Sequence, residues 1–339
     1  MTPAVLIQDL QKRYGSVEAL NGVTFHVEPG EIFGLLGPNG AGKTTTLRCL
    51  CTLAAPDAGT IKVSGISAIA QPKRVRQRLG YVAQEVALDK VLTGRELLEL
   101  QAALYHIPQA EAAKRINAMA QLLGLSDRLD QKSGTYSGGL KKRLDLAAGL
   151  LHQPDVLVLD EPTVGLDIES RVVVWDFLRQ LKANGTTVLL TSHYLEEVDA
   201  LADRVAIIDK GTVIASGTSS DLKDKVGGDR ITLRIREFTA EDEANQARGL
   251  LKKLPFVQEI IINESQGNSL NLVVDPQSEA LITVRQTLKD AGLPTFGISQ
   301  ARPSLDDVYL AATGKTLMDA ELAAAASRDV KAERKQNMR

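Results

Sequence analysis

A glycine-rich segment, GPNGAGKTT, carries the clearest chemical signal in the sequence. Gly37, Gly42, Lys43 and Thr44 match the pattern G-x-x-x-x-G-K-[ST] between the apolar run EIFGLL and a helical stretch. In this setting the loop N–H groups and the helix N-terminus can surround phosphates, while Lys43 supplies a positive charge and Thr44 a hydroxyl for Mg²⁺. The residues predicted to contact a nucleoside triphosphate are Gly37, Pro38, Asn39, Gly40, Ala41, Gly42, Lys43, Thr44 and Thr45.

Three more polar residues follow strand-like apolar runs. Asp160 and Glu161 end the run VLVLDE, and His193 follows TTVLLTS. Ligands of open α/β sheets bind beyond the carboxyl ends of the strands, so these side chains are expected near the phosphate loop. Asp160 is predicted to hold Mg²⁺, Glu161 to orient or deprotonate the water that attacks the γ-phosphate, and His193 to donate to a γ-phosphate oxygen. Lys43, Glu161 and His193 are thus the predicted catalytic residues.

The elements that must position these residues form two domains. Short β-rich runs alternate with helical stretches over residues 1–220, which predicts an α/β core with a mixed sheet and a helical subdomain at about 87–155. Thr93 and Glu96 form a capping box within that subdomain. After the polar stretch LKDKVGGDR, residues 221–314 follow the order β-α-β-β-α-β, which predicts a smaller α+β domain of ferredoxin-like topology. Residues 315–339 are alanine-rich and then charged, which predicts a helical or disordered tail.

The composition of the chain limits its expected partners and cellular compartment. The chain has 339 residues, 44% of them hydrophobic, and a net charge of −2, so nothing favours nucleic-acid binding. It contains no run of about 18 apolar residues, and therefore any membrane contact is expected to need another chain. Two cysteines, Cys49 and Cys51, provide no disulfide framework, and the N-terminus lacks the apolar core of a secretory signal. A reducing cytoplasm fits these features best.

The segment YSGGLK, from Tyr136 to Lys141, completes a recognisable set because it shortly precedes VLVLDEP. It resembles the signature motif of ATP-binding cassette (ABC) ATPases. Ser137, Gly138 and Gly139 would open a helix whose free N–H groups form a second anion site. In that family the signature faces the phosphate loop of a partner, so the resemblance implies two ATP molecules held head-to-tail between two such domains.

Three further positions are similar to ABC landmarks: Tyr14 as the aromatic ring on which adenine stacks, Gln84 in YVAQE as a glutamine that contacts the metal, and Asp167 in VGLD as an interface residue. The resemblance covers residues 4–220. It implies the P-loop ABC cassette fold and the cofactors ATP and Mg²⁺. The implied metal ligands are Thr44, Gln84 and Asp160, and the implied contacts to the partner's ATP are Ser137, Gly138, Gly139 and Asp167.

Two positions depart from the common signature, since Tyr136 stands where leucine is usual and Leu140 where glutamine is usual. Together with PSLDDVYLAATG at residues 303–314, this variant resembles the daunorubicin/doxorubicin-resistance branch, which serves exporters with separate membrane subunits. The resemblance implies a dimeric ATPase subunit that reaches the cytoplasmic face of the cell membrane through an integral membrane permease. The alternatives are a non-transport ABC ATPase acting on ribosomes or nucleic acid, and a regulatory ligand-binding role for the C-terminal domain. The transported substrate is not encoded in these residues.

Overall fold

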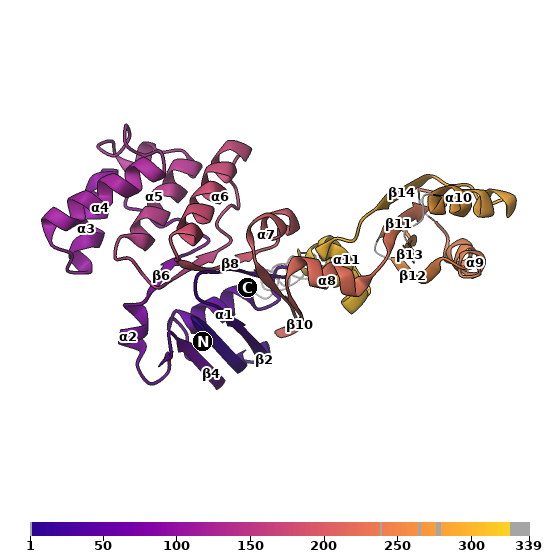
Figure 1. Ribbon diagram of the computed structural model, residues 1–339, viewed down its shortest axis with the longest axis horizontal. Helices are drawn as coiled ribbons and strands as arrows, with labels where there is room; N and C mark the ends of the chain where they lie inside the picture. Colours follow the sequence, from indigo (N-terminus) through magenta and orange to yellow (C-terminus); the bar gives the residue numbers. More distant parts are fainter. Residues whose placement is uncertain (1, 238, 264–265, 276–278, 326–339) are drawn as a thin grey trace, which may run out of the picture. The chain divides into compact units, whose positions relative to one another are not determined.

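The computed structural model describes residues 2–237, 239–263, 266–275 and 279–325. The chain divides into two compact units, Met1–Ser216 and Gly217–Arg339. Figure 1 shows the first in indigo to rose and the second in orange to yellow.

A six-stranded sheet forms the centre of the first unit, with the strand order β10-β9-β3-β8-β7-β6. The paired strands β6, β7, β8, β3 and β9 run parallel. Every residue of β3, β7 and β8 is buried, which explains why these strands appear in the sequence as continuous apolar runs. The strand bounds are β3 (Ile32–Leu36), β6 (Leu79–Val82), β7 (Val156–Asp160), β8 (Thr187–Ser192), β9 (Arg204–Asp209) and β10 (Thr212–Gly217).

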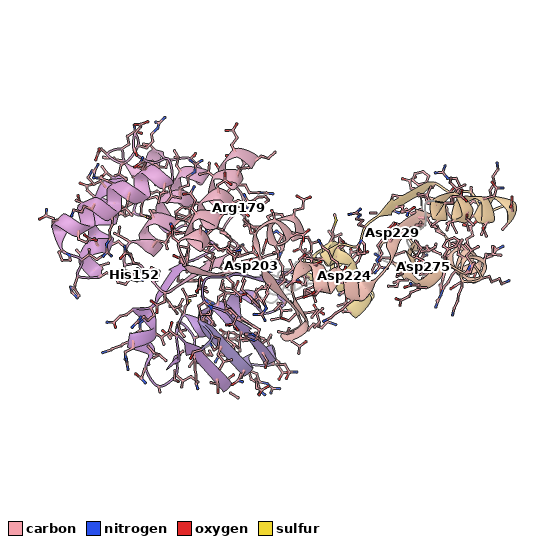
Figure 2. The ribbon with its side chains drawn as sticks, viewed as in Figure 1. His152, Arg179, Asp203, Asp224, Asp229 and Asp275 are labelled. Carbon is pink, nitrogen blue, oxygen red and sulfur yellow. The ribbon has the colours of Figure 1, made fainter. Side chains whose placement is uncertain are left out.

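The register of this sheet aligns the strand ends that precede the predicted site residues. Leu36 pairs with Ser192, and Asp160 pairs with Thr191. The phosphate loop, Glu161 and His193 therefore all follow strand ends at the same edge of the six-stranded sheet. At the opposite edge, Asp203 (Figure 2) accepts from Ile32 N at 2.9 Å and from Lys182 Nζ, so it fixes the start of β3.

A second sheet of the first unit is antiparallel, with the order β2-β1-β4-β5. The strands predicted to form one mixed sheet are thus divided between two sheets, because β1 and β2 alternate buried and exposed residues and cover only one face of the core. Helix α1 belongs to the core that joins both sheets (Figure 1). The bounds are β1 (Val5–Tyr14), β2 (Val17–Val27), α1 (Lys43–Leu50), β4 (Ala58–Val63), β5 (Ile66–Ser67) and α2 (Pro72–Arg76).

Helices cover the other face of the six-stranded sheet, and several of them form a separate group (Figure 1). That group lies in the region predicted to be helical, and α3 begins at the predicted Thr93–Glu96 capping box. The Tyr105 ring stacks on His152 (Figure 2) with 3.8 Å between centroids, and His152 Nε2 lies 3.0 Å from Leu79 O. The end of α3 is therefore tied to the start of β6. The bounds are α3 (Gly94–Leu104), α4 (Gln109–Leu122), η1 (Ser133–Thr135), α5 (Gly138–Leu150), α6 (Ile168–Ala183) and α7 (Leu195–Leu201).

The second unit contains a four-stranded antiparallel sheet in the order β12-β13-β11-β14. With its two helices it confirms the predicted β-α-β-β-α-β order and ferredoxin-like topology. Its core is apolar and includes Ile231, Leu272 and Val284, each fully buried. The bounds are β11 (Asp229–Arg234), α9 (Glu241–Leu251), β12 (Val257–Asn263), β13 (Ser269–Val274), α10 (Ala280–Asp290) and β14 (Gly297–Ala301).

Two helices flank this sheet along the chain, α8 (Ser219–Val226) and α11 (Leu305–Thr313). The polar stretch that the sequence presents as a boundary is therefore partly helical, because Thr218 caps α8 and Leu222 is buried. Arg230 Nε lies 3.2 Å from Asp307 Oδ1 and joins β11 to α11. Residues 317–325 are also helical, and residues 326–339 of the predicted tail lie outside the described residues. No helix in the described ranges is both long enough and apolar enough to span a membrane.

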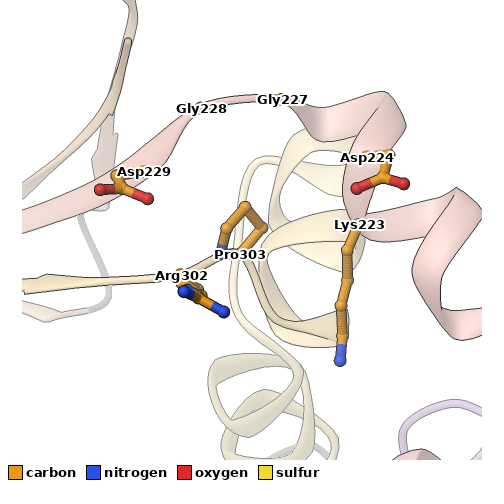
Figure 3. A pocket seen from close by; sticks show the side chains of 7 residues that line it. All are labelled: Lys223, Asp224, Gly227, Gly228, Asp229, Arg302 and Pro303. Carbon is orange, nitrogen blue, oxygen red and sulfur yellow. The ribbon is translucent and has the colours of Figure 1, made fainter. Parts of the chain in front are cut away.

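Gly227 and Gly228 connect α8 to β11 with φ values of 65° and 58°. A Cβ on Gly228 would lie 2.3 Å from Val274 O, whereas the nearest atom to a Cβ on Gly227 is 3.8 Å away. The connector borders a cavity of about 440 Å³ (Figure 3). Both signs of charge line that cavity, whose residues are Lys223, Asp224, Gly227, Gly228, Asp229, Arg302 and Pro303.

The replacement Gly228→Ala should lower the free energy of opening of the second unit more than Gly227→Ala does. Each puts alanine at a positive φ that residues with a side chain rarely adopt, at about 1–3 kcal/mol, and only Gly228→Ala adds overpacking, at about 1–3 kcal/mol more. Hydrogen exchange of the β11 amides would give the free energy of opening in each variant. Equal losses in the two variants would show that the close approach to Val274 is unimportant.

Candidate nucleotide-binding site

The predicted phosphate loop lies between β3 and α1, where close packing requires glycine. A Cβ on Gly37 would lie 2.2 Å from Ile208 O. Gly42 has φ 114°, and its Cβ would lie 2.9 Å from Ala19 O. Gly40 also has a positive φ, of 86°. Because α1 begins at Lys43, the loop delivers a helix N-terminus to the sheet edge.

Lys43 lies inside the curve of this loop. Its Nζ donates to Gly37 O at 2.6 Å and to Pro38 O at 3.3 Å, and it lies 3.2 Å from Glu161 Oε1. Both charged side chains are almost fully buried, with 5% of Lys43 and 4% of Glu161 exposed. The ammonium group is thus held inside the loop, where it can donate charge-assisted hydrogen bonds to the oxygens of a bound phosphate.

Asp160 meets the loop through hydroxyl groups. Thr44 Oγ1 lies 3.3 Å from Asp160 Oδ1, and Thr191 Oγ1 donates to the same oxygen at 2.7 Å. Asp160 is 1% exposed and Thr191 fully buried. The carboxylate is therefore fixed beside Thr44, the residue with which it was predicted to share a metal ion.

Glu161 connects four elements of the site. Its backbone is left-handed, with φ 47°, and its N–H donates to Thr191 Oγ1 at 2.9 Å. Its Oε2 accepts from Gln84 Nε2 at 3.0 Å and lies 3.3 Å from His193 Nδ1. Strained backbone in a non-glycine residue is common at functional sites, where surrounding contacts maintain it.

The electrostatics of Glu161 favour its charged form. Burial raises the pKa of this carboxyl, but the His193 hydrogen bond and the Lys43 charge more than offset burial, and the net pKa is lowered. A depressed pKa keeps the group ionised above its ordinary value of 4.5. Glu161 is thus a carboxylate at neutral pH, as a proton acceptor must be.

The donor set fits Mg²⁺. The described residues hold no group of three or more histidine, cysteine or acidic side chains that could form an all-protein metal cage. Mg²⁺ is usually bound by one or two carboxylates with water and substrate phosphates. Thr44 and Asp160, with Gln84 hydrogen-bonded to the adjacent Glu161, would supply hard oxygen ligands of that kind, and the ion would neutralise phosphate charge.

The signature residues lie at the start of helix α5 in the same unit. Ser137 caps α5 and accepts from Leu140 N at 3.3 Å. A Cβ on Gly138 would meet nothing within 4 Å, whereas one on Gly139 would lie 2.2 Å from Ser170 Oγ. Gly138 therefore leaves the helix N-terminus open.

Asp167 adjoins this surface, because it caps α6 and accepts from Ser170 N at 2.7 Å. Tyr136, which stands where leucine is usual in the signature, is buried and donates to Arg128 O at 2.5 Å, so its hydroxyl anchors the signature to the helical group.

Tyr14 is 46% exposed at the end of β1, and its ring lies 5.4 Å from Lys12 Nζ. The structure joins Lys43, Thr44, Gln84, Asp160, Glu161 and His193 by direct contacts. The contacts of Tyr14, Ser137 and Asp167 given above are to other residues.

Two residues that sequence reasoning missed support the site. Thr191 holds Asp160 and Glu161 together, and its signal was only its place two residues before His193. Lys142 is 3% exposed and donates to Ala83 O at 2.7 Å, next to Gln84. In the sequence, only its position directly after Lys141 of the signature segment distinguished Lys142.

This fold and site define a P-loop nucleotide-binding cassette. A sequence model described as ABC transporter matches residues 20–164. A daunorubicin resistance ATP-binding protein of Streptomyces coeruleorubidus is 43% identical, over 92% of this chain and 96% of the relative. The chain therefore belongs to the ATP-binding subunits of ABC transporters, an ATPase family.

Another relative and a solved structure agree with this family assignment. A Nod factor export ATP-binding protein of Burkholderia orbicola is 41% identical, over 92% of this chain and 97% of its own length. A solved ATP-binding subunit of an ABC transporter superposes with a TM-score of 0.62 and 30% identity, and the match covers 67% of this chain and 94% of that chain. The predicted cassette fold and the family resemblance are confirmed.

Replacement of Thr191 by valine should impair ATP hydrolysis. Valine keeps the shape but leaves the buried Glu161 N–H without its acceptor, a loss of about 1–3 kcal/mol, equivalent to about 5- to 160-fold in kcat. Thr191→Ser keeps the hydroxyl and should stay within about 3-fold of the wild type in a steady-state ATPase assay. If Thr191→Val also stayed within that range, the hydroxyl would have no part in positioning Glu161.

Proposed function

We propose that the chain is the ATP-hydrolysing subunit that powers an ABC exporter, working as a dimer with two ATP molecules between phosphate loops and signature motifs. The observation that carries this proposal is the contact of Glu161 with Lys43, Gln84 and His193 at one sheet edge. Phosphoryl transfer requires that a phosphate cradle, a base and a donor converge in this way.

Each contact suggests a role in hydrolysis. Glu161 would orient the attacking water and accept its proton, while Lys43 and the loop N–H groups would bind the β- and γ-phosphates. His193 would donate to a γ-phosphate oxygen. Attack of the water on the γ-phosphorus breaks the bond to the bridging oxygen and yields ADP and phosphate. Thr44, Gln84 and Asp160 are the proposed contacts to Mg²⁺, and Tyr14 is the proposed adenine contact.

The open N-terminus of α5 supports the dimer. Ser137 satisfies one N–H of the first turn, and Gly138 leaves room for an anion to approach. Ser137, Gly138, Gly139 and Asp167 are the proposed contacts to the partner's ATP. We assign residues 1–220 to the cassette, 221–314 to a C-terminal domain that supports dimerisation, and 315–339 to a tail.

Exposed apolar side chains that follow Gln84 along the chain are suited to contact a membrane permease. Val91, Leu100 and Leu104 have exposed fractions of 71%, 51% and 67%, although all are large and apolar. Such side chains favour burial against a partner. Since Gln84 contacts Glu161, a permease bound here would sense the nucleotide and hold the chain at the cytoplasmic face of the cell membrane.

Export is favoured over the alternative of work on ribosomes or nucleic acid. The relatives carry names of drug resistance and Nod factor export. The longest of the helices α1 to α11 in the described residues is α6, which has 16 residues. A helix of this length is too short for a long coiled-coil insertion. The cargo would be chosen by the permease.

Replacement of Leu104 by glutamate should uncouple the chain from its permease. Purified chain would be combined in liposomes with a multi-span membrane protein encoded beside it, and ATPase activity measured with and without that partner. In Leu104→Glu, the stimulation of ATPase activity by the partner should be at least about 5-fold smaller than in the wild type, because a charge opposes apolar burial. The activity without the partner should be unchanged. The control is Ile282→Glu on α10, where the native side chain is 65% exposed. A wild-type chain that no membrane partner stimulates would contradict the exporter proposal.

A further inference from the structure

Lys142 is a buried lysine on the signature helix for which the proposed hydrolysis has no use. Its Nζ donates to Ala83 O at 2.7 Å and lies 3.5 Å from Gln84 O. Burial lowers the pKa of Lys142, and burial raises the pKa of Asp145, on the same helix, to about 6. Because the Lys142 side chain is 3% exposed, it holds the segment before Gln84 where little water competes for its hydrogen bond to Ala83 O.

The same helix begins at the surface proposed to meet the partner's ATP. Gly138 and Lys142 are four residues apart and share one face of α5. Gly139 packs closely on Ser170 of α6. A displacement of the α5 N-terminus is thus expected to carry Lys142 with it, because a short helix moves as a rigid body.

On the other side of Lys142 lies the chain's own catalytic cluster. Ala83 directly precedes Gln84, whose Nε2 donates to Glu161 Oε2 at 3.0 Å. Glu161 lies 3.2 Å from Lys43. A continuous series of contacts therefore runs from the signature helix through Lys142 to the base of the phosphate site in the same chain.

We propose that Lys142 is a positioning residue that couples the two ATP sites of the dimer. ATP held by the partner's phosphate loop contacts the N-terminus of α5, and Lys142 transmits the resulting helix position to Gln84 and Glu161 of its own site. Occupancy of one site then favours the closed arrangement of the other, which is positive cooperativity between distinct sites. The inference rests on the dimer under "Proposed function" and adds the residue that connects its two sites.

The test is the ATP dependence of hydrolysis by the full chain. We expect a Hill coefficient near 2 for the wild type and near 1 for Lys142→Met, which keeps the length of the side chain but cannot donate to Ala83 O. Lys142→Arg keeps a donor and should restore a coefficient above about 1.5. The replacement Lys114→Met, at an exposed position on α4, is the matched control and should keep the wild-type value.

Two further measurements separate coupling from a merely structural role. The melting temperature of Lys142→Met should fall by only about 2–10 °C, the cost of one lost buried hydrogen bond, so the chain stays folded in the assay. Lys142→Met combined with Glu161→Gln should still form an ATP-bound dimer. Wild-type cooperativity in Lys142→Met, or a dimeric wild type with a Hill coefficient of 1, would overturn the coupling role. A Glu161→Gln chain that stays monomeric with ATP would instead refute the dimer itself.

Discussion

The arrangement of the site depends on one buried carboxylate. Glu161 is 4% exposed and contacts a lysine of the phosphate loop, a glutamine that follows β6 and a histidine that follows β8. A buried charge is costly unless it is paired and hydrogen-bonded, so each of these elements is constrained to meet at Glu161. The left-handed backbone at Glu161, tied to Thr191 Oγ1, directs the side chain into that meeting point.

The parallel sheet makes this convergence possible. Its register aligns Leu36 with Ser192, and Asp160 with Thr191, so residues far apart in the chain leave the sheet at one edge. The signature helix lies elsewhere in the unit, and its open glycine faces away from its own chain's packing. Such a division suits the proposed site completed by a second copy, and Lys142 connects the signature helix to the segment before Gln84 within one chain.

The sequence was sufficient for the residues whose chemistry depends on spacing. The phosphate loop, Asp160, Glu161 and His193 follow buried parallel strands, which have a distinctive apolar pattern, and the structure places them together. Thr191 and Lys142 could not be predicted in the same way, because a threonine in a strand and a lysine in a helix are ordinary, and only tertiary contacts give them a role. Helix α8 was missed because its residues are mostly polar, and its single buried leucine leaves no apolar period to detect.

Two chains are proposed to share each ATP site, and the oligomeric state of a hydrolysis-deficient variant tests this arrangement most directly. Sedimentation of Glu161→Gln with saturating Mg²⁺-ATP should show a dimer that holds two nucleotides, because hydrolysis would no longer release the closed state. With Gly138→Asp added, each chain should still bind one ATP but remain monomeric, since the new carboxylate would repel the partner's phosphates at the α5 N-terminus. A Glu161→Gln chain that stays monomeric with ATP, or a double variant that dimerises equally well, would contradict the account.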